Sequence, residues 1–177
     1  CDHCNTNIDT SDYNDICYPD NYNGIDNFGH IMCSKDIYVD DIGKGLPLVL
    51  VHGFLGSSEM WSPQKKFLSK YFRVITPALP GFGESNKIKS HNSINDMAQT
   101  VLRSLKKKGV EKFNLLGHSM GGMIVQEMTK IAGEKITKLI CYATSPIGNI
   151  PGRFETMDES REKLKNEGLE KTANRIA

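Results

Sequence analysis

The sequence lacks several features that would place it in particular classes of protein. No apolar run in its 177 residues approaches the roughly 20 residues that span a bilayer, and no basic region followed by an apolar stretch stands at the N-terminus. Its five cysteines are an odd number, which disfavours a disulfide framework when no secretion signal is present. With 38% hydrophobic and 24% charged residues, the composition predicts a soluble globular protein. We therefore expect a cytoplasmic protein with no membrane partner.

Basic residues are absent from the first 31 positions. Residues 1–31 contain six Asp and six Asn but no Lys or Arg, whereas the rest of the chain has 22 basic and 15 acidic side chains. The segment shows no helical or alternating apolar period, so burial cannot easily offset the entropy of ordering it. We expect residues 1–31 to be a disordered acidic extension of no catalytic importance, and a domain to begin at Met32. The net charge of +1 indicates no nucleic-acid partner.

The cysteines do not form a convincing metal site. Zinc needs four converging ligands, and Cys1-x-x-Cys4 supplies only two of them. A second close pair is missing, because fifteen residues lie between Cys17 and Cys33. We therefore expect no metal and no cofactor. Cys141 lies in an apolar run and is predicted to be a buried core thiol.

Short β-rich runs alternate with amphipathic helical stretches after Met32. Strands are predicted at residues 36–40, 46–51, 72–77, 112–116 and 136–144, and helices from residue 62, at 93–108 and at 121–132. Ser93 and Asp96 predict a helix cap. The helix from residue 62 is expected to carry Phe67, Leu68 and Tyr71 on one face. This alternation predicts an α/β fold with a doubly wound, mostly parallel sheet.

The character of the chain changes after Pro146. Residues 147–153 are rich in Gly and Pro, and residues 155–177 are a charged helical stretch with few large aliphatic side chains. Such a helix has no strong apolar face to bury. We expect residues 147–177 to form a helical excursion from the sheet.

A G-x-S-x-G motif follows the strand predicted at 112–116. It reads Gly117-His118-Ser119-Met120-Gly121, and a helix is predicted to start at its end. A strand-to-helix turn this tight forces its central residue into strained backbone geometry, and the flanking glycines relieve the crowding. The hydroxyl of Ser119 is then held clear of the sheet, with a helix N-terminus directed at it. Ser119 is therefore a candidate nucleophile. The alternative is an ordinary glycine-rich turn between a strand and a helix.

Four blocks, in this order, resemble the α/β-hydrolase superfamily: Leu48–Phe54, Trp61, Pro80–Ser85 and Gly117–Gly122. The first looks like the strand and H-G-x oxyanion loop of that family, and the last like its nucleophile elbow. Among its branches, the chain looks most like enol-lactonases, meta-cleavage product hydrolases and carboxylesterases. The resemblance implies the first half of an α/β-hydrolase core over residues 32–146 and the start of a helical cap over residues 147–177.

The resemblance also implies a role for each residue of the site. Ser119 would attack an acyl carbonyl and form a covalent acyl-enzyme. The backbone N–H groups of Met120 and Phe54 would hold the oxyanion. Three neighbouring residues would shape the loop and the elbow: His52, Gly53 and His118. The expected substrate is a small molecule with an ester, a lactone or a C–C bond next to a carbonyl.

The other two members of a catalytic triad are not found in the sequence. In this fold the triad runs Ser, acid, His along the chain, but no histidine follows His118. Residues 143–146, which follow the last predicted strand, contain no carboxylate. We expect a sequence that is truncated inside a cap. The alternative is a catalytically inactive hydrolase fold that serves as a binding or interaction module. The sequence does not indicate an oligomeric state.

Overall fold

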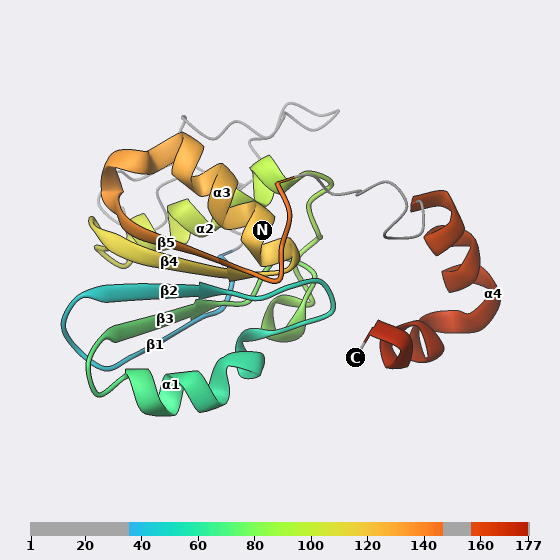
Figure 1. Cartoon of the computed structure of the whole chain (residues 1–177), viewed down its shortest axis with the longest axis horizontal. Helices are drawn as coiled ribbons and strands as arrows, with labels where there is room; N and C mark the ends of the chain where they lie inside the picture. Colours follow the sequence, from blue (N-terminus) through green and yellow to red (C-terminus); the bar gives the residue numbers. More distant parts are fainter. Residues whose placement is uncertain (1–35, 147–156, 177) are drawn as a thin grey trace, which may run out of the picture. The chain divides into compact units, whose positions relative to one another are not determined.

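Five strands form one sheet in the part of the chain that the structure describes. A computed structural model describes residues 36–146 and 157–176 (Figure 1). The strands are β1 (Val39–Ile42), β2 (Pro47–Val51), β3 (Arg73–Pro77), β4 (Phe113–His118) and β5 (Ile136–Tyr142). Their order is β1-β3-β2-β4-β5. Only β1 is antiparallel to its neighbour, so β3, β2, β4 and β5 form a parallel block.

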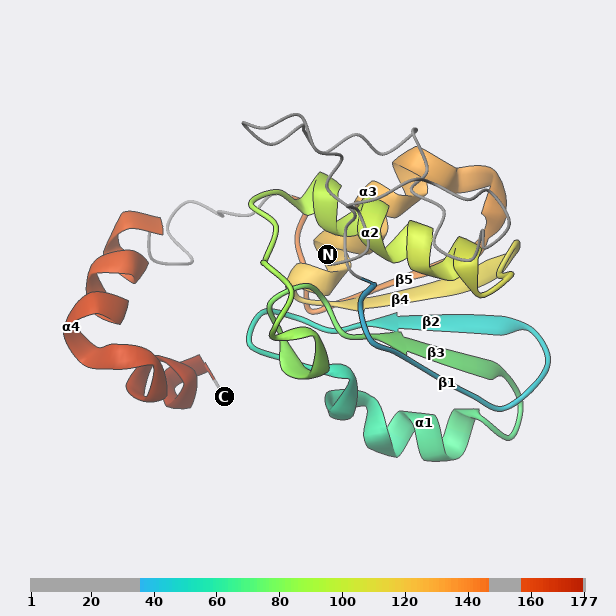
Figure 2. The same ribbon diagram turned by 180° about the vertical axis from the view of Figure 1, so that it is seen from behind.

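The described residues form four α-helices, of which three cover the two faces of this sheet (Figures 1 and 2). They are α1 (Ser62–Leu68), α2 (Ile94–Lys107), α3 (Met120–Ala132) and α4 (Met157–Ile176), with short 3-10 helices at Ser58–Trp61, Gly83–Ser85 and Gly133–Lys135. Figures 1 and 2 show α2 and α3 on one face of the sheet and α1 on the other. The predicted doubly wound α/β architecture is confirmed.

The buried strands explain the two cores. Successive side chains of a strand point to opposite faces of the sheet. In β2, Val49 and Val51 therefore join a core with α2 and α3, whereas Leu48 and Leu50 join a second core with Trp61. Both faces of β2 are covered, and its sequence is accordingly a continuous apolar run.

Helix α2 begins and packs as its sequence predicts. The Ser93 hydroxyl accepts a hydrogen bond from the Asp96 N–H at 3.1 Å and donates one to the Asp96 carboxylate at 2.7 Å. Met97, Val101 and Leu105 are buried at helical spacing against the sheet. The predicted cap is confirmed, and the buried side chains lie on one face of the helix.

The prediction that Phe67, Leu68 and Tyr71 share one face of the helix is partly wrong. Leu68 is half-buried and packs in the second core, but Phe67 and Tyr71 are 59% and 64% exposed. The buried face instead combines Leu68 with Lys65, which is 7% exposed. Lys65 can lie there because its ammonium group reaches Asp40 of β1 at 2.6 Å. Phe67 and Tyr71 pack against each other on the outer surface, with ring centroids 5.7 Å apart.

Strand β5 differs from the other parallel strands. It pairs with β4, and six of its seven residues are exposed. Cys141 is therefore exposed, and the prediction of a buried core thiol is wrong. An apolar run indicates a strand, but burial also requires a neighbour on each side and a cover on each face.

The predicted charged helix is present as α4, with a break at Gly168, where φ is +82°. None of the helices in residues 36–146 and 157–176 is long and apolar enough to cross a membrane. The predicted extension at residues 1–31, the start of a domain at Met32, the ligands considered for zinc and the loop at 147–153 lie outside the described residues.

Candidate functional site

The G-x-S-x-G segment forms a sharp turn between a strand and a helix. Strand β4 ends at His118, and α3 begins at Met120, so Ser119 alone makes the turn. Its backbone has φ 53° and ψ −120°, a region that residues with a side chain rarely adopt. The predicted strained geometry is thus present at Ser119.

Two glycines allow the turn to pack against its surroundings. A Cβ at Gly121 would overlap the carbonyl oxygens of Val51 and His52 at the end of β2. A Cβ at Gly122 would overlap the side chain of Thr144 beyond β5. Helix α3 therefore approaches the strand ends more closely than any larger residue at these positions permits.

Hydrogen bonds fix the backbone of Ser119 on both sides. Its N–H donates to the carbonyl of Tyr142 at 3.0 Å. Its carbonyl accepts from the Thr144 hydroxyl at 2.7 Å and from the Gly122 N–H at 2.9 Å. These bonds hold the strained conformation in place, as a pre-organised site requires.

The start of α3 provides a favourable environment for negative charge. Met120 is the first residue of the helix, so its N–H has no carbonyl partner within the helix. The aligned peptide dipoles make this end partially positive. The turn also lies beyond the carboxyl ends of parallel strands, where open α/β sheets bind their ligands.

The segment after β2 lies directly against this turn. A Cβ at Gly53 would lie 3.1 Å from the Ser119 Cβ and 3.1 Å from the His118 carbonyl oxygen. Phe54 follows with a side chain that is 55% exposed and an edge-on contact to Phe82, whose centroid is 5.8 Å away. The structure thus brings Gly53 against Ser119, although the two are more than sixty positions apart in the chain.

His52 is completely buried, and backbone groups occupy both of its ring nitrogens. Nδ1 lies 2.8 Å from the Gly53 carbonyl, and the Leu79 N–H donates to Nε2 at 2.9 Å. The second bond requires an unprotonated Nε2, so the ring is neutral with its proton on Nδ1. Burial lowers the pKa of His52 below its usual 6.5, which agrees with this state. Neither nitrogen is free to take a proton from a substrate.

The other described histidines do not reach the Ser119 hydroxyl. His118 is half-buried beside Tyr142, and its Nδ1 is buried with no hydrogen-bond partner within residues 36–146 and 157–176. His91 is half-buried, and its Nε2 lies 2.8 Å from the Thr100 hydroxyl. Within the described ranges, no hydrogen bond joins the Ser119 hydroxyl to a histidine. No cluster of three metal-binding side chains occurs there either.

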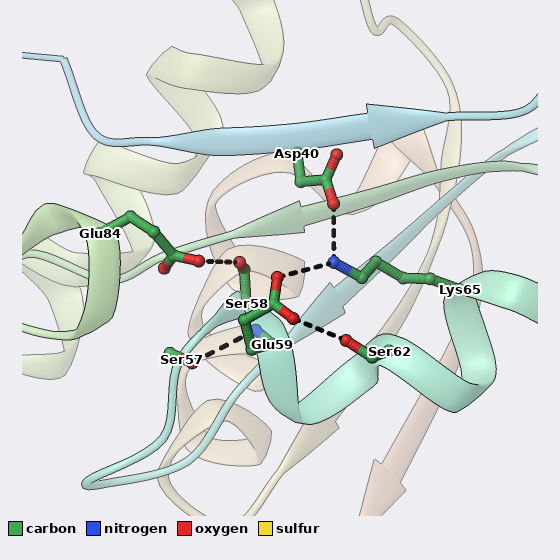
Figure 3. Close-up of polar contacts among 7 residues, drawn as sticks. All are labelled: Asp40, Ser57, Ser58, Glu59, Ser62, Lys65 and Glu84. Atoms are coloured by element: carbon green, nitrogen blue, oxygen red, sulfur yellow. Dashed lines mark hydrogen bonds and ion pairs between the residues drawn. The ribbon is translucent and has the colours of Figure 1, made fainter.

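A polar cluster beside the loop was not predicted. The hydroxyl of Ser58 donates to the Glu84 carboxylate at 2.6 Å, and nearby Lys65 contacts Asp40 and Glu59 (Figure 3). Ser58 and Glu84 stand 26 positions apart, so no local sequence pattern links them. The one available signal was that Glu84 lies in Pro80–Ser85, a block that resembles the family.

Comparisons with known proteins agree with this architecture. A sequence model of the family described as alpha/beta hydrolase fold matches residues 47–176. A pimeloyl-[acyl-carrier protein] methyl ester esterase of Photobacterium profundum is 32% identical over 127 residues, which are 69% of this chain and 48% of that protein.

Solved structures show the same relationship. An esterase from Thermogutta terrifontis is 33% identical with a TM-score of 0.66, over 75% of this chain and 49% of that one. In a study of carboxylesterases from Nitrososphaera gargenis, one structure is 27% identical with a TM-score of 0.70, over 78% and 52% of the two chains. The chain therefore spans about half the length of these relatives. On its sequence and its fold, it belongs to the α/β-hydrolase family.

Proposed function

We propose that this chain supplies the nucleophile and the oxyanion-binding N–H groups of a serine hydrolase. The observation that carries the proposal is the conformation of Ser119, with φ 53°, at a one-residue turn between β4 and α3. The close approach of Gly53 to the Ser119 Cβ supports the same conclusion, because Phe54 follows Gly53 in the chain. A strained serine at this point of an α/β sheet fits a nucleophile better than an ordinary glycine-rich turn, which gains nothing from strain at a non-glycine residue.

The proposed reaction proceeds through a covalent acyl-enzyme. The Ser119 hydroxyl attacks the carbonyl carbon of the substrate and transfers its proton to a general base. The carbonyl oxygen becomes an oxyanion, to which the N–H groups of Met120 and Phe54 donate hydrogen bonds. Each such donor contributes about 3 kcal/mol to stabilising the transition state. Water then releases the acyl group. His52 cannot be the base because both of its nitrogens are occupied, and no other histidine within the described ranges is hydrogen-bonded to the Ser119 hydroxyl.

The proposed substrate is a small molecule with an ester, a lactone or a C–C bond next to a carbonyl. The names of the relatives support the first of these, since the Photobacterium protein is a methyl ester esterase and the Thermogutta structure is an esterase. We also propose action in the cytoplasm, which the odd number of cysteines supports because it disfavours a disulfide framework.

One observation favours a second candidate, a catalytically inactive fold that binds a partner. Within residues 36–146 and 157–176, no histidine is hydrogen-bonded to the Ser119 hydroxyl. The two candidates differ in whether the Ser119 hydroxyl reacts as a nucleophile.

Labelling with a fluorophosphonate distinguishes them. The full-length polypeptide should be labelled rapidly, and Ser119→Ala should abolish the label without changing the melting temperature greatly. Ser62→Ala is the matched control, because it also removes a serine hydroxyl and should keep the label. Equal labelling of the Ser119→Ala variant would show that the proposed nucleophile is wrong.

A further inference from the structure

Two loops lie side by side, and the first of them contacts the Ser119 turn through Gly53. The first, residues 52–58, follows β2, and the second, residues 79–85, follows β3. They meet at both ends and in the middle. Leu79 donates to His52, Phe82 packs on Phe54 with ring centroids 5.8 Å apart, and Glu84 accepts from Ser58.

The contact is closest near Gly83. A Cβ at this residue would lie 2.5 Å from the Ser57 Cβ, and Gly83 has a φ of +47°. No larger residue fits between the loops without moving one of them. The loops therefore have little freedom to slide, and the Ser58–Glu84 hydrogen bond next to this contact fixes their spacing.

The Ser58–Glu84 hydrogen bond is short and formed by a buried donor. Ser58 is completely buried, and its hydroxyl lies 2.6 Å from Glu84 Oε1. Partial burial of the Glu84 carboxyl acts to raise its pKa, but hydrogen bonds from the Ser58 hydroxyl and from backbone N–H groups outweigh this and lower the pKa. Glu84 is thus ionised near neutral pH, and the bond is charge-assisted, which makes it stronger than a bond between neutral groups.

Further contacts anchor the same loop to α1 and β1 (Figure 3). Glu59 accepts from the Ser62 hydroxyl at 2.8 Å and lies 3.5 Å from the Lys65 ammonium group. Lys65 in turn binds Asp40 at 2.6 Å. These contacts hold the residues after Ser58 to the scaffold, whereas the Ser58–Glu84 bond joins the loop to residues 79–85.

We propose that the Ser58–Glu84 hydrogen bond is a positioning contact that aligns the Phe54 N–H with Ser119. This inference rests on the proposed function, because it gives Phe54 the role of an oxyanion donor. His52 and Ser58 are the two ends of the segment that carries Phe54, and loop 79–85 holds both of them. Neither Ser58 nor Glu84 is proposed to touch the substrate, so their effect on the reaction passes through the position of the Phe54 backbone.

The test uses hydrolysis of p-nitrophenyl acetate by the full-length polypeptide. Glu84 is exposed, so Glu84→Ala should fold, and it should lower kcat about tenfold with little change in KM. Glu84→Gln keeps an acceptor for the Ser58 hydroxyl and should restore most of kcat. Ser62→Ala, which breaks a bond in the same cluster without separating the loops, should stay within about twofold of the parent.

Hydrogen exchange of the backbone supplies a readout that does not depend on activity. Residues 53–58 should exchange faster in Glu84→Ala than in the parent or in Ser62→Ala. The inference is overturned if Glu84→Ala keeps the parent kcat, or if Glu84→Gln loses as much as Glu84→Ala. If Ser119→Ala retained full activity, the proposed function would fail instead, and faster exchange in Glu84→Ala would then report only the contact between the loops.

Discussion

Replacing Gly121 by alanine would place a methyl group between α3 and the end of β2. The new Cβ would lie 2.8 Å from the Val51 carbonyl carbon and closer still to the carbonyl oxygens of Val51 and His52. Ordinary contacts of this kind begin at 3.4 Å, so α3 or the strand end must shift by roughly 0.6 Å or more. Both partners are backbone atoms inside regular elements, so neither can yield by rotating a side chain.

The expected cost follows from two opposing effects. Overpacking a well-packed interior costs about 1–3 kcal/mol. Alanine in place of glycine within a helix stabilises the folded chain by up to about 1 kcal/mol. Because rigid backbone atoms are displaced, we expect the upper part of the first range and a net loss of about 2 kcal/mol in the free energy of unfolding.

Urea denaturation of the parent and Gly121→Ala chains measures this loss. Gly133→Ala is the control, since nothing lies within 4 Å of a Cβ at Gly133, and its φ of −56° suits alanine. Gly133→Ala should leave the free energy of unfolding unchanged or raise it by about 0.4–1 kcal/mol. A Gly121→Ala chain as stable as the parent would refute the close approach of α3 to β2, on which the geometry of the turn depends.

Three further predictions concern charge, the buried histidine and the sheet edge. Arg73→Met should cost about 1 kcal/mol at pH 7, because Arg73 binds both Asp41 oxygens, at 2.9 and 2.7 Å. Hydrogen bonding from Arg73 lowers the pKa of Asp41, so the difference in the free energy of unfolding between Arg73→Met and the parent should shrink as the pH falls below 3.8. A difference that stays constant with pH would contradict this. His52 has a lowered pKa and is neutral in the folded chain, so the parent should lose stability as the pH falls below 6.5. The His52→Asn variant should lose less stability over the same pH range. Equal losses in both chains would contradict the assignment of a neutral His52. Ile140→Lys on the exposed β5 edge should reduce self-association in light scattering at equal concentration, and unchanged scattering would show that this edge is not where copies associate.

The sequence predicts best those elements that are formed by residues close together in the chain. The continuous apolar run of β2 is buried on both faces and was recognised within one residue. The Ser93 cap of α2 also appeared as predicted, because a cap depends on residues only three positions apart. The Ser119 turn belongs to the same group, since its strand, its glycines and its helix are adjacent in the chain.

Contacts between distant segments were not predictable. From hydrophobicity alone, Phe67 is expected in the core and Lys65 on the surface. In the structure Phe67 is exposed and Lys65 is buried, because the carboxylate of Asp40 in β1 pairs with the Lys65 ammonium group. The exposure of Cys141 depends on what lies beside β5, which the apolar run itself does not encode. The Ser58–Glu84 bond joins two loops that only the order of the strands brings together.

The most direct test of the central claim is to locate the acyl group during turnover. The full-length polypeptide is mixed with p-nitrophenyl acetate, quenched in acid within the first turnovers, digested with trypsin and analysed by mass spectrometry. We predict one acetyl group on the peptide of residues 113–130, in which Ser119 is the only serine. Turnover with the acetyl group on another residue, or with Ser119→Ala at the parent rate, would contradict the account.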